Sequence, residues 1–312
     1  MKNSLLLFLR GIAMGAVDLI PGVSAGTIAF ITGIYVELVT SIKSFNLEAI
    51  RILKAQGMAA TWQHLNGNFL ATLLAGILVS LFSLAGVMKF FLINYPLPLW
   101  SFFTGLIVAS VIFLLRQYPL NRPSSYVLLC LGVVFAYGIS IAPATLIEAN
   151  LITMFFAGSI ALCAMILPGI SGSFILVLLG LYPVFIDALV DVKLDILAVF
   201  AMGGVIGLML FSRLLSWLLD HYLNWVIATM CGFLMGSLTV IWPWKLVTET
   251  MFSHSGKTIV LASENILPHN YYSLVGQDPQ TTVCVMALLG GFCLVFAIEY
   301  LGDKFRDELK VD

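Results

Sequence analysis

The sequence predicts an all-α polytopic membrane protein made of two inverted repeats, each a Pro-Gly-broken re-entrant helical hairpin followed by three transmembrane helices. Of the 312 residues, 61% are hydrophobic and only 10% are charged, and the mean hydropathy is +1.05. A soluble domain is about half apolar and a quarter charged, so this chain falls outside that class. Uncharged stretches such as 66–88 and 123–143 are long enough for a helix to cross about 30 Å of hydrocarbon.

An internal repeat is the observation that divides the chain into halves. The segment 8–35, FLRGIAMGAVDLIPGVSAGTIAFITGIY, aligns without gaps on 155–182, FFAGSIALCAMILPGISGSFILVLLGLY, at an offset of 147. The match continues at an offset of 127, where Gly76 meets Gly203. The change of offset corresponds to a polar insert at 46–65, which is present in the first half alone.

The first repeat is predicted to span residues 1–143 and to begin with a broken hairpin at 4–43. The insert at 46–65 mixes apolar and charged positions in a way that suits a short helix at the membrane interface. Three transmembrane helices are then expected at about 66–93, 98–116 and 124–142.

The second repeat is predicted to span residues 148–312, with its hairpin at 150–190 and a polar loop at 243–280. A hairpin that enters and leaves on one side adds nothing to the number of membrane crossings. The three transmembrane helices of each half then make an odd number of crossings. The second half is therefore expected upside down relative to the first, the architecture typical of secondary transporters. Its transmembrane helices are expected at about 195–219, 223–242 and 281–301.

Charge placement predicts the orientation in the cell membrane. With a cytoplasmic N-terminus, eleven Lys and Arg residues fall on the cytoplasmic side and four on the other side. This bias predicts that both termini are cytoplasmic and that the loop at 243–280 is external. Arg10 interrupts the first apolar run, so we expect the N-terminal segment to be retained rather than cleaved as a signal peptide.

The two Pro-Gly pairs, Pro21-Gly22 and Pro168-Gly169, predict where each hairpin breaks. A break frees backbone N–H groups at membrane depth, which is tolerated only when protein, water or a ligand binds them. The N-terminus of the following half-helix carries partial positive charge and favours an anion, above all phosphate. We expect the residues after the breaks to bind that anion through hydroxyls and close backbone approach: Ser24, Gly26, Thr27, Ser171, Gly172 and Ser173.

Charged residues near the first break are the next candidates, because ionisable groups inside a membrane are costly to keep. Arg10 is expected to pair with the anion, while Asp18 and Glu37 are candidates for proton or sodium coupling. A mutual Arg10–Asp18 pair that closes the hairpin is the structural alternative. Lys43 is expected toward the cytoplasmic side, and Arg213 is expected to snorkel to that interface.

Other classes of site have little support in the sequence. The five cysteines lie in apolar segments without a CxxC pair, and the four histidines show no ligand spacing, so no metal or cofactor is expected. The net charge of −1 suggests no nucleic-acid partner.

The segments GIAMGAVDLIPGVSAGTIAFITGIY and AMILPGISGSFILVLLGLY resemble the bacterial and archaeal family of polyprenyl-phosphate transporters, the undecaprenyl-phosphate translocases. The resemblance covers essentially the whole chain, although Ala25 stands where the family usually has a further glycine. It implies that undecaprenyl phosphate is returned from the outer to the cytoplasmic leaflet, for reuse as a lipid carrier in cell-wall and surface-glycan synthesis. It also implies a transporter rather than an enzyme.

Two other functions remain open at this point. A small-anion carrier or channel would use the same hairpins, but it would need no lipid. An intramembrane enzyme acting on a lipid phosphate would need a nucleophile or metal, and no DxD or HExxH pattern or histidine pair supports one. The hairpin breaks could also be ordinary kinks whose small residues serve helix packing alone.

Overall fold

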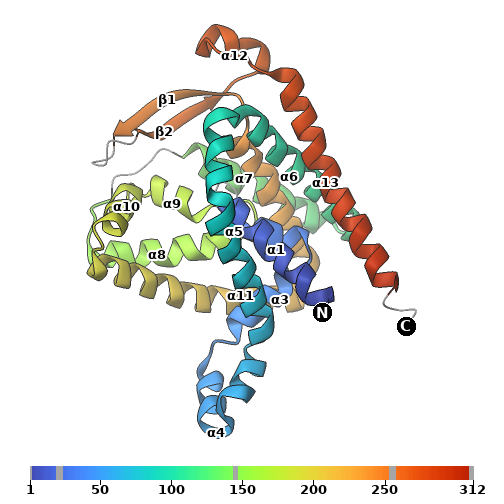
Figure 1. Cartoon of the computed structure of the whole chain (residues 1–312), viewed down its shortest axis with the longest axis vertical. Coiled ribbons are helices and arrows are strands. Elements are labelled where there is room, and N and C mark those ends of the chain that lie inside the picture. Colours follow the sequence, from blue (N-terminus) through green and yellow to red (C-terminus); the bar gives the residue numbers. More distant parts are fainter. Residues whose placement is uncertain (1, 19–23, 143–146, 253–257, 309–312) are drawn as a thin grey trace. The chain divides into compact units, whose positions relative to one another are not determined.

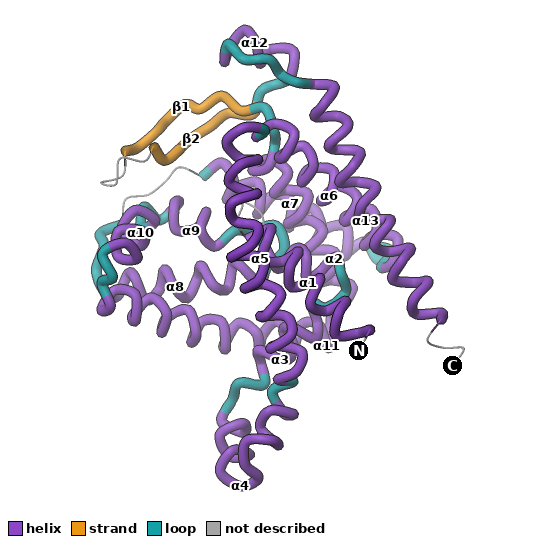
Figure 2. Tube along the Cα trace, viewed as in Figure 1, coloured by secondary structure: helices purple, strands orange, loops and turns teal. Residues whose placement is uncertain are grey.

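The described residues of the computed structural model form helices, connecting loops and one two-stranded sheet, which consists of β1 (Lys245–Phe252) and β2 (Thr258–Asn265) (Figures 1 and 2). Pro21 and Gly22, which sequence analysis placed at the first break, lie outside the described residues. The structure describes residues 2–18, 24–142, 147–252 and 258–308.

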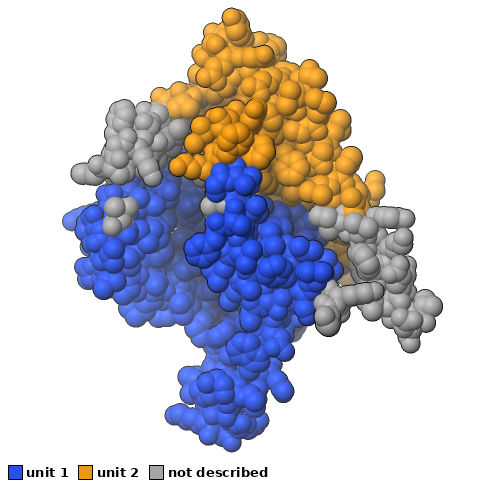
Figure 3. Space-filling model, in the orientation of Figure 1, with its two compact units in different colours: residues 1–88, 142–226, 252–258 blue, residues 89–141, 227–251, 259–312 orange. Residues whose placement is uncertain are grey.

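The chain is divided into two compact units, coloured in Figure 3. Each unit takes helices from both halves of the sequence. Unit 1 holds both hairpins and the first long helix of each half, and unit 2 holds the later helices and the strands. Unit 1 comprises Met1–Met88, Ala142–Val226 and Phe252–Thr258, and unit 2 comprises Lys89–Ile141, Ile227–Met251 and Ile259–Asp312.

Each hairpin of unit 1 consists of one longer helix followed by two short ones. The two short helices are bent relative to each other by 120° in the first hairpin and by 117° in the second. The first hairpin contains α1 (Lys2–Asp18), α2 (Ala25–Ile31) and α3 (Tyr35–Lys43). The second contains α8 (Leu151–Ile166), α9 (Gly172–Leu178) and α10 (Tyr182–Val190).

The bend between the short helices is made by the same turn in both hairpins. Its centre is a glycine in the left-handed conformation, Gly33 with φ 74° and Gly180 with φ 70°. In each turn the amide after the glycine bonds at 3.0 Å to the carbonyl five residues earlier, as in a Schellman motif. The sequence predicts a single break in each hairpin, at the Pro-Gly pair. The structure shows this second break in addition.

The long helices follow the predicted boundaries closely. The element α11 (Leu194–Ile241) consists of two helices that meet at a kink at Tyr222, with φ −135° and ψ 38°, where the sequence predicted a turn at 220–222. Its 48 residues would measure about 72 Å as one straight helix, far more than one crossing requires. The others are α5 (Gly67–Asn94), α6 (Pro96–Gln117), α7 (Pro123–Ile141) and α13 (Thr281–Glu308).

Judged by length and composition, four helices among the described residues could cross a membrane, or up to six if each bent pair counts as one span. The chain is thus a multi-pass membrane protein.

The insert forms α4 (Leu47–His64), which is kinked at Gly57 with φ 82°. Ala49 and Thr61 are its buried residues, so most of its surface faces away from unit 1. A location at the membrane interface remains a prediction that fits this exposure. The exposed apolar side chains are Leu47, Ile50, Leu53, Met58 and Trp62.

Paired glycines bring the helices of unit 1 together in the same way in both halves. A Cβ atom on Gly76 of α5 would meet the carbonyl oxygen of Phe8 on α1. A Cβ atom on Gly203 of α11 would meet the carbonyl oxygen of Phe155 on α8. Since Phe8 matches Phe155 and Gly76 matches Gly203 in the repeat, the two halves share this contact.

Unit 2 uses a second set of glycines, in two contacts that each join a helix of the first half to a helix of the second half. Gly105 of α6 and Gly291 of α13 allow those helices to approach closely, and Gly132 of α7 and Gly232 of α11 do the same. Gly105 corresponds to Gly232 in the repeat.

The segment predicted as a polar loop at 243–280 contains the two strands and α12 (Pro268–Val275). The Trp244 indole N–H donates to the carbonyl of Pro279 at 2.9 Å. Lys245 Nζ donates to the carbonyl of Val240 at 2.5 Å, which caps the end of α11. Burial of the Lys245 ammonium lowers its pKa to about 8.

Gly76→Val should destabilise unit 1 by roughly 1–3 kcal/mol, because a side chain there would press on the α1 backbone. Gly86→Val is the matched control on the same helix, since a Cβ atom there meets nothing within 4 Å. Thermal unfolding of the purified variants in detergent measures the difference. Equal unfolding temperatures would show that the glycine contact does not determine helix packing.

Candidate functional site

The breaks of the two hairpins meet inside unit 1. Ser24 Oγ, before α2, donates to the carbonyl of Met165 at the end of α8, at 2.5 Å. The amide of Gly169 donates to Thr27 Oγ1 on α2 at 3.1 Å. Ser24 and Thr27 are 2% and 0% exposed, so both hydrogen bonds lie away from solvent. We call these four residues, Ser24, Thr27, Met165 and Gly169, the hairpin junction.

At the N-terminus of α2, the chain itself supplies acceptors for the first amides. Asp18 Oδ1 accepts from the amide of Ala25 at 2.9 Å. Ser24 Oγ accepts from Gly26 at 3.1 Å, and the Ser24 carbonyl accepts from Thr27 at 2.9 Å. This end of the helix is therefore capped by a carboxylate and a hydroxyl, both favourable at the positive end of a helix.

The N-terminus of α9 is different, although the sequence motif is similar. Ser171 makes no side-chain cap, and its Oγ lies 2.9 Å from Ser173 Oγ instead. Within the described part of the chain, the amides of Gly172 and Ser173 make no hydrogen bond. The residue that corresponds to Asp18 is Met165, which has no charge. The second half thus offers two amides and two hydroxyls where the first half is already capped.

The glycines expected to let a ligand approach are packed against α8. A Cβ atom on Gly26 would lie 2.8 Å from the Met165 carbonyl oxygen, and one on Gly172 would lie 2.5 Å from the Ala161 carbonyl oxygen. The missing side chains therefore allow the short helices to lie on α8. Any role of these two glycines in ligand binding remains a prediction.

The charged candidates lie at different distances from the junction. Asp18 is placed there by its bond to Ala25, and Arg10 is half-buried about 12 Å earlier along α1. Glu37 lies in the exposed first turn of α3 and accepts from Asn66 Nδ2 at 2.9 Å, next to the insert. The structure brings Asp18 to the hairpin junction, but it links Glu37 to Asn66, directly after the insert.

The residues of the second break are described by the structure, in contrast to Pro21 and Gly22. Pro168 is fully buried, and Gly169 has φ 83°, a conformation that favours glycine. No group of three His, Cys, Asp or Glu residues that could hold a metal ion occurs among the described residues.

Sequence reasoning missed two buried hydroxyls. Among the described residues, neither Tyr35 on α3 nor Ser80 on α5 finds a hydrogen-bond partner for its buried side-chain oxygen. A buried hydroxyl without a partner is costly, which makes both side chains candidates for contact with water or a ligand. The repeated tyrosine, Tyr35 and Tyr182, was visible in the alignment, but a tyrosine at a helix start is an ordinary packing residue.

Ser24→Ala should destabilise the fold by about 1–2 kcal/mol, since it removes both the cap of α2 and the bond to Met165. Ser171→Ala should cost less, because that hydroxyl caps nothing and bonds only to Ser173. Thermal unfolding of the two variants compares them directly. An equal loss of stability would contradict the asymmetry between the two helix ends.

Comparison with known proteins gives the family. Residues 14–259 match the model of a family described as VCA0040-like, undecaprenyl phosphate translocase-like. A polyprenyl-phosphate transporter of Vibrio cholerae serotype O1 is 43% identical over 302 residues, which cover 97% of this chain and 98% of that protein. A polyprenyl-phosphate transporter of Staphylococcus aureus is 31% identical over 253 residues, 75% of this chain and 85% of that protein. No solved structure matches the chain. This chain belongs to the undecaprenyl phosphate translocase-like family.

Proposed function

We propose that this chain transports polyprenyl phosphate, returning undecaprenyl phosphate from the outer to the cytoplasmic leaflet of the cell membrane. The two relatives named polyprenyl-phosphate transporters support the substrate class. Returned carrier would be available again for cell-wall and surface-glycan synthesis. In this proposal the chain moves the lipid without chemical change, so it is a flippase and not an enzyme.

The hairpin junction is the observation that carries the proposal. A phosphate monoester is charged near neutral pH, and moving it through bare hydrocarbon is prohibitively costly. Two broken helices that meet in one unit offer a polar path for the headgroup, while the isoprenoid tail stays in lipid. Arg10, half-buried on α1, is the proposed charge partner.

We assign the first headgroup contacts to Ser171 and Ser173. The N-terminus of α9 has hydroxyls that cap no amide and amides that no side chain caps. The other motif residues hold the hairpin junction together. They would contact the headgroup only when the junction opens. Those residues are Ser24, Gly26, Thr27 and Gly172.

The architecture proposed for this function is a pair of inverted repeats with re-entrant hairpins. Bends of 120° and 117° between the short helices support this proposal, in which each hairpin would turn back toward the side from which it entered. With three crossings in each half, both termini would then be cytoplasmic, as the charge placement predicts.

The double variant Ser171→Ala/Ser173→Ala should bind undecaprenyl phosphate roughly tenfold more weakly, because it loses hydrogen bonds to a charged group. The matched control is Ser83→Ala, which removes an exposed hydroxyl that bonds only to its own helix. Binding to purified protein is measured together with the unfolding temperature. A stable double variant that binds like the parent would exclude these serines from the site.

The same preparation separates the alternative functions. Reconstituted vesicles that accumulate inorganic phosphate, but do not move the lipid, would favour a small-anion carrier. Release of phosphate from the lipid by purified protein would favour an intramembrane enzyme.

Asp18→Asn should flatten the pH dependence of transport if this carboxyl takes up the coupled proton. An asparagine oxygen can still accept from Ala25, so the cap of α2 and the fold should survive. Transport in proteoliposomes across a range of pH values measures the effect, with Glu37→Gln as the second coupling candidate. A profile identical to that of the parent would leave Asp18 as a helix cap alone.

A further inference from the structure

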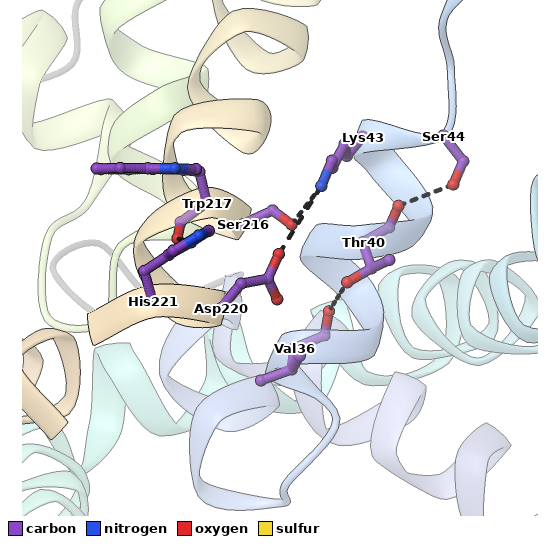
Figure 4. Close-up of polar contacts among 8 residues, drawn as sticks. All are labelled: Val36, Thr40, Lys43, Ser44, Ser216, Trp217, Asp220 and His221. Atoms are coloured by element: carbon purple, nitrogen blue, oxygen red, sulfur yellow. Dashed lines mark hydrogen bonds and ion pairs between the residues drawn. The ribbon is translucent and has the colours of Figure 1, made fainter. Parts of the chain in front are cut away.

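A second polar cluster of unit 1 lies at the far end of the first hairpin, away from the breaks. Figure 4 shows Lys43, the last residue of α3, extending toward Ser216 and Asp220 on α11. Lys43 Nζ donates to Ser216 Oγ at 2.9 Å and lies 4.0 Å from Asp220 Oδ2. The cluster therefore joins the hairpin to the first long helix of the second half.

The ion pair in this cluster is weak. The side chains of Lys43 and Asp220 are 40% and 59% exposed, and pairs at this distance and exposure contribute little to stability. Ser216, by contrast, is only 3% exposed. Its oxygen accepts from Lys43, and its own hydroxyl hydrogen finds no acceptor in the part of the chain that the structure describes. The Lys43 ammonium and the Ser216 hydroxyl therefore still have hydrogen-bond donors available. An anion that binds more strongly than Asp220 could accept from both.

A further cation lies on the same face of α11. Arg213 precedes Ser216 by three residues, the spacing that puts two side chains on one helix surface. Arg213 is exposed, and no acidic partner for it occurs among the described residues. Of these two cations only Lys43 is paired with a carboxylate of the described residues, and that pair with Asp220 is weak.

The depth of the cluster in the membrane is indicated by aromatic residues at the break of α11. Trp217 and Tyr222 have ring centroids 5.7 Å apart, and Tyr222 stacks on Trp225 at 5.2 Å. Trp and Tyr gather where the bilayer meets water, which is also where a lipid carries its headgroup. Lys43 and Arg213 are both among the cations that the predicted topology places on the cytoplasmic side.

The cluster is not repeated in the other half. At the repeat offsets, Lys43 corresponds to Val190, and Asp220 corresponds to Ile93. A site that occurs once gives the two membrane faces different affinities for the same ligand, which the repeated hairpins alone do not provide.

We propose that Lys43, Ser216 and Arg213 form a second site for a phosphate monoester headgroup carried on a lipid. While this site is empty, Asp220 pairs with Lys43. This inference rests on the proposed transport of polyprenyl phosphate. In that transport the site is the station on the cytoplasmic face, where the headgroup is held. Lysine supplies a point charge for phosphate, and charge-assisted hydrogen bonds to phosphate are stronger than an exposed ion pair.

Variants of Lys43 and of its partner Asp220 should change lipid binding in opposite directions, which tests the site. Lys43→Gln and Ser216→Ala should each weaken binding of undecaprenyl phosphate to the purified full chain by roughly tenfold. Asp220→Asn should tighten it by about threefold, because the competing anion is removed. Lys43→Arg should keep most of the binding, and Lys54→Gln, which removes an exposed lysine of α4, should change nothing.

Inorganic phosphate and undecaprenol are the comparison probes, with the unfolding temperature recorded for every variant. Weaker binding in both Lys43→Gln and Asp220→Asn would overturn the site and make the pair a latch between α3 and α11. Parent-like binding in Lys43→Gln would overturn the site and leave the proposed function standing. Binding of inorganic phosphate with the same dependence on Lys43, without binding of the lipid, would overturn both the lipid assignment and the proposed function.

Discussion

The rest of the structure depends on how the backbone polar groups of two broken helices are satisfied in a chain that spans a membrane. A break inside hydrocarbon frees amides and carbonyls, and lipid offers them no partner. Here side chains of the first hairpin supply partners for the backbone of the second, since Ser24 donates to the Met165 carbonyl and Thr27 accepts from the Gly169 amide. The second break therefore depends on the first, and a mutation at the first break should be felt at the second.

The same constraint makes the two halves unequal at the place where a ligand would bind. Asp18 and Ser24 occupy the amides at the start of α2, whereas Met165 replaces the carboxylate in the second half and leaves the start of α9 uncapped. An anion competes with a built-in carboxylate on one side and meets none on the other. In the proposed function, phosphate would bind at α9 and α2 would be its rigid support.

The periodic and repeated features of the chain could be predicted from the sequence, because they depend on composition over long windows. The long helices, the insert and the correspondence of Gly76 with Gly203 are of this kind. The turn at Gly33 could not, since a single glycine in an apolar helix is common and its positive φ depends on the packing around it. Gly26 and Gly172 fitted a ligand site in the sequence, but the structure fills the space beside them with the backbone of α8. A one-dimensional motif does not reveal whether a glycine approaches a ligand or a neighbouring helix.

In the proposed architecture of inverted repeats, the scaffold by itself would have no preferred direction, because equivalent contacts would face both sides of the membrane. Direction requires residues that occur once. The unrepeated polar groups of unit 1 include Asp18 at the junction and Lys43 with Asp220 at the end of the hairpin. Asp220 holds a position beside a lysine that a phosphate could take, whereas Asp18 caps α2 and the headgroup would bind at α9. A transported anion would therefore exchange places with a carboxylate of the protein at the cytoplasmic station. Such exchange keeps the number of unpaired charges low at that station, which is the condition for moving a charged headgroup across a medium of low dielectric constant.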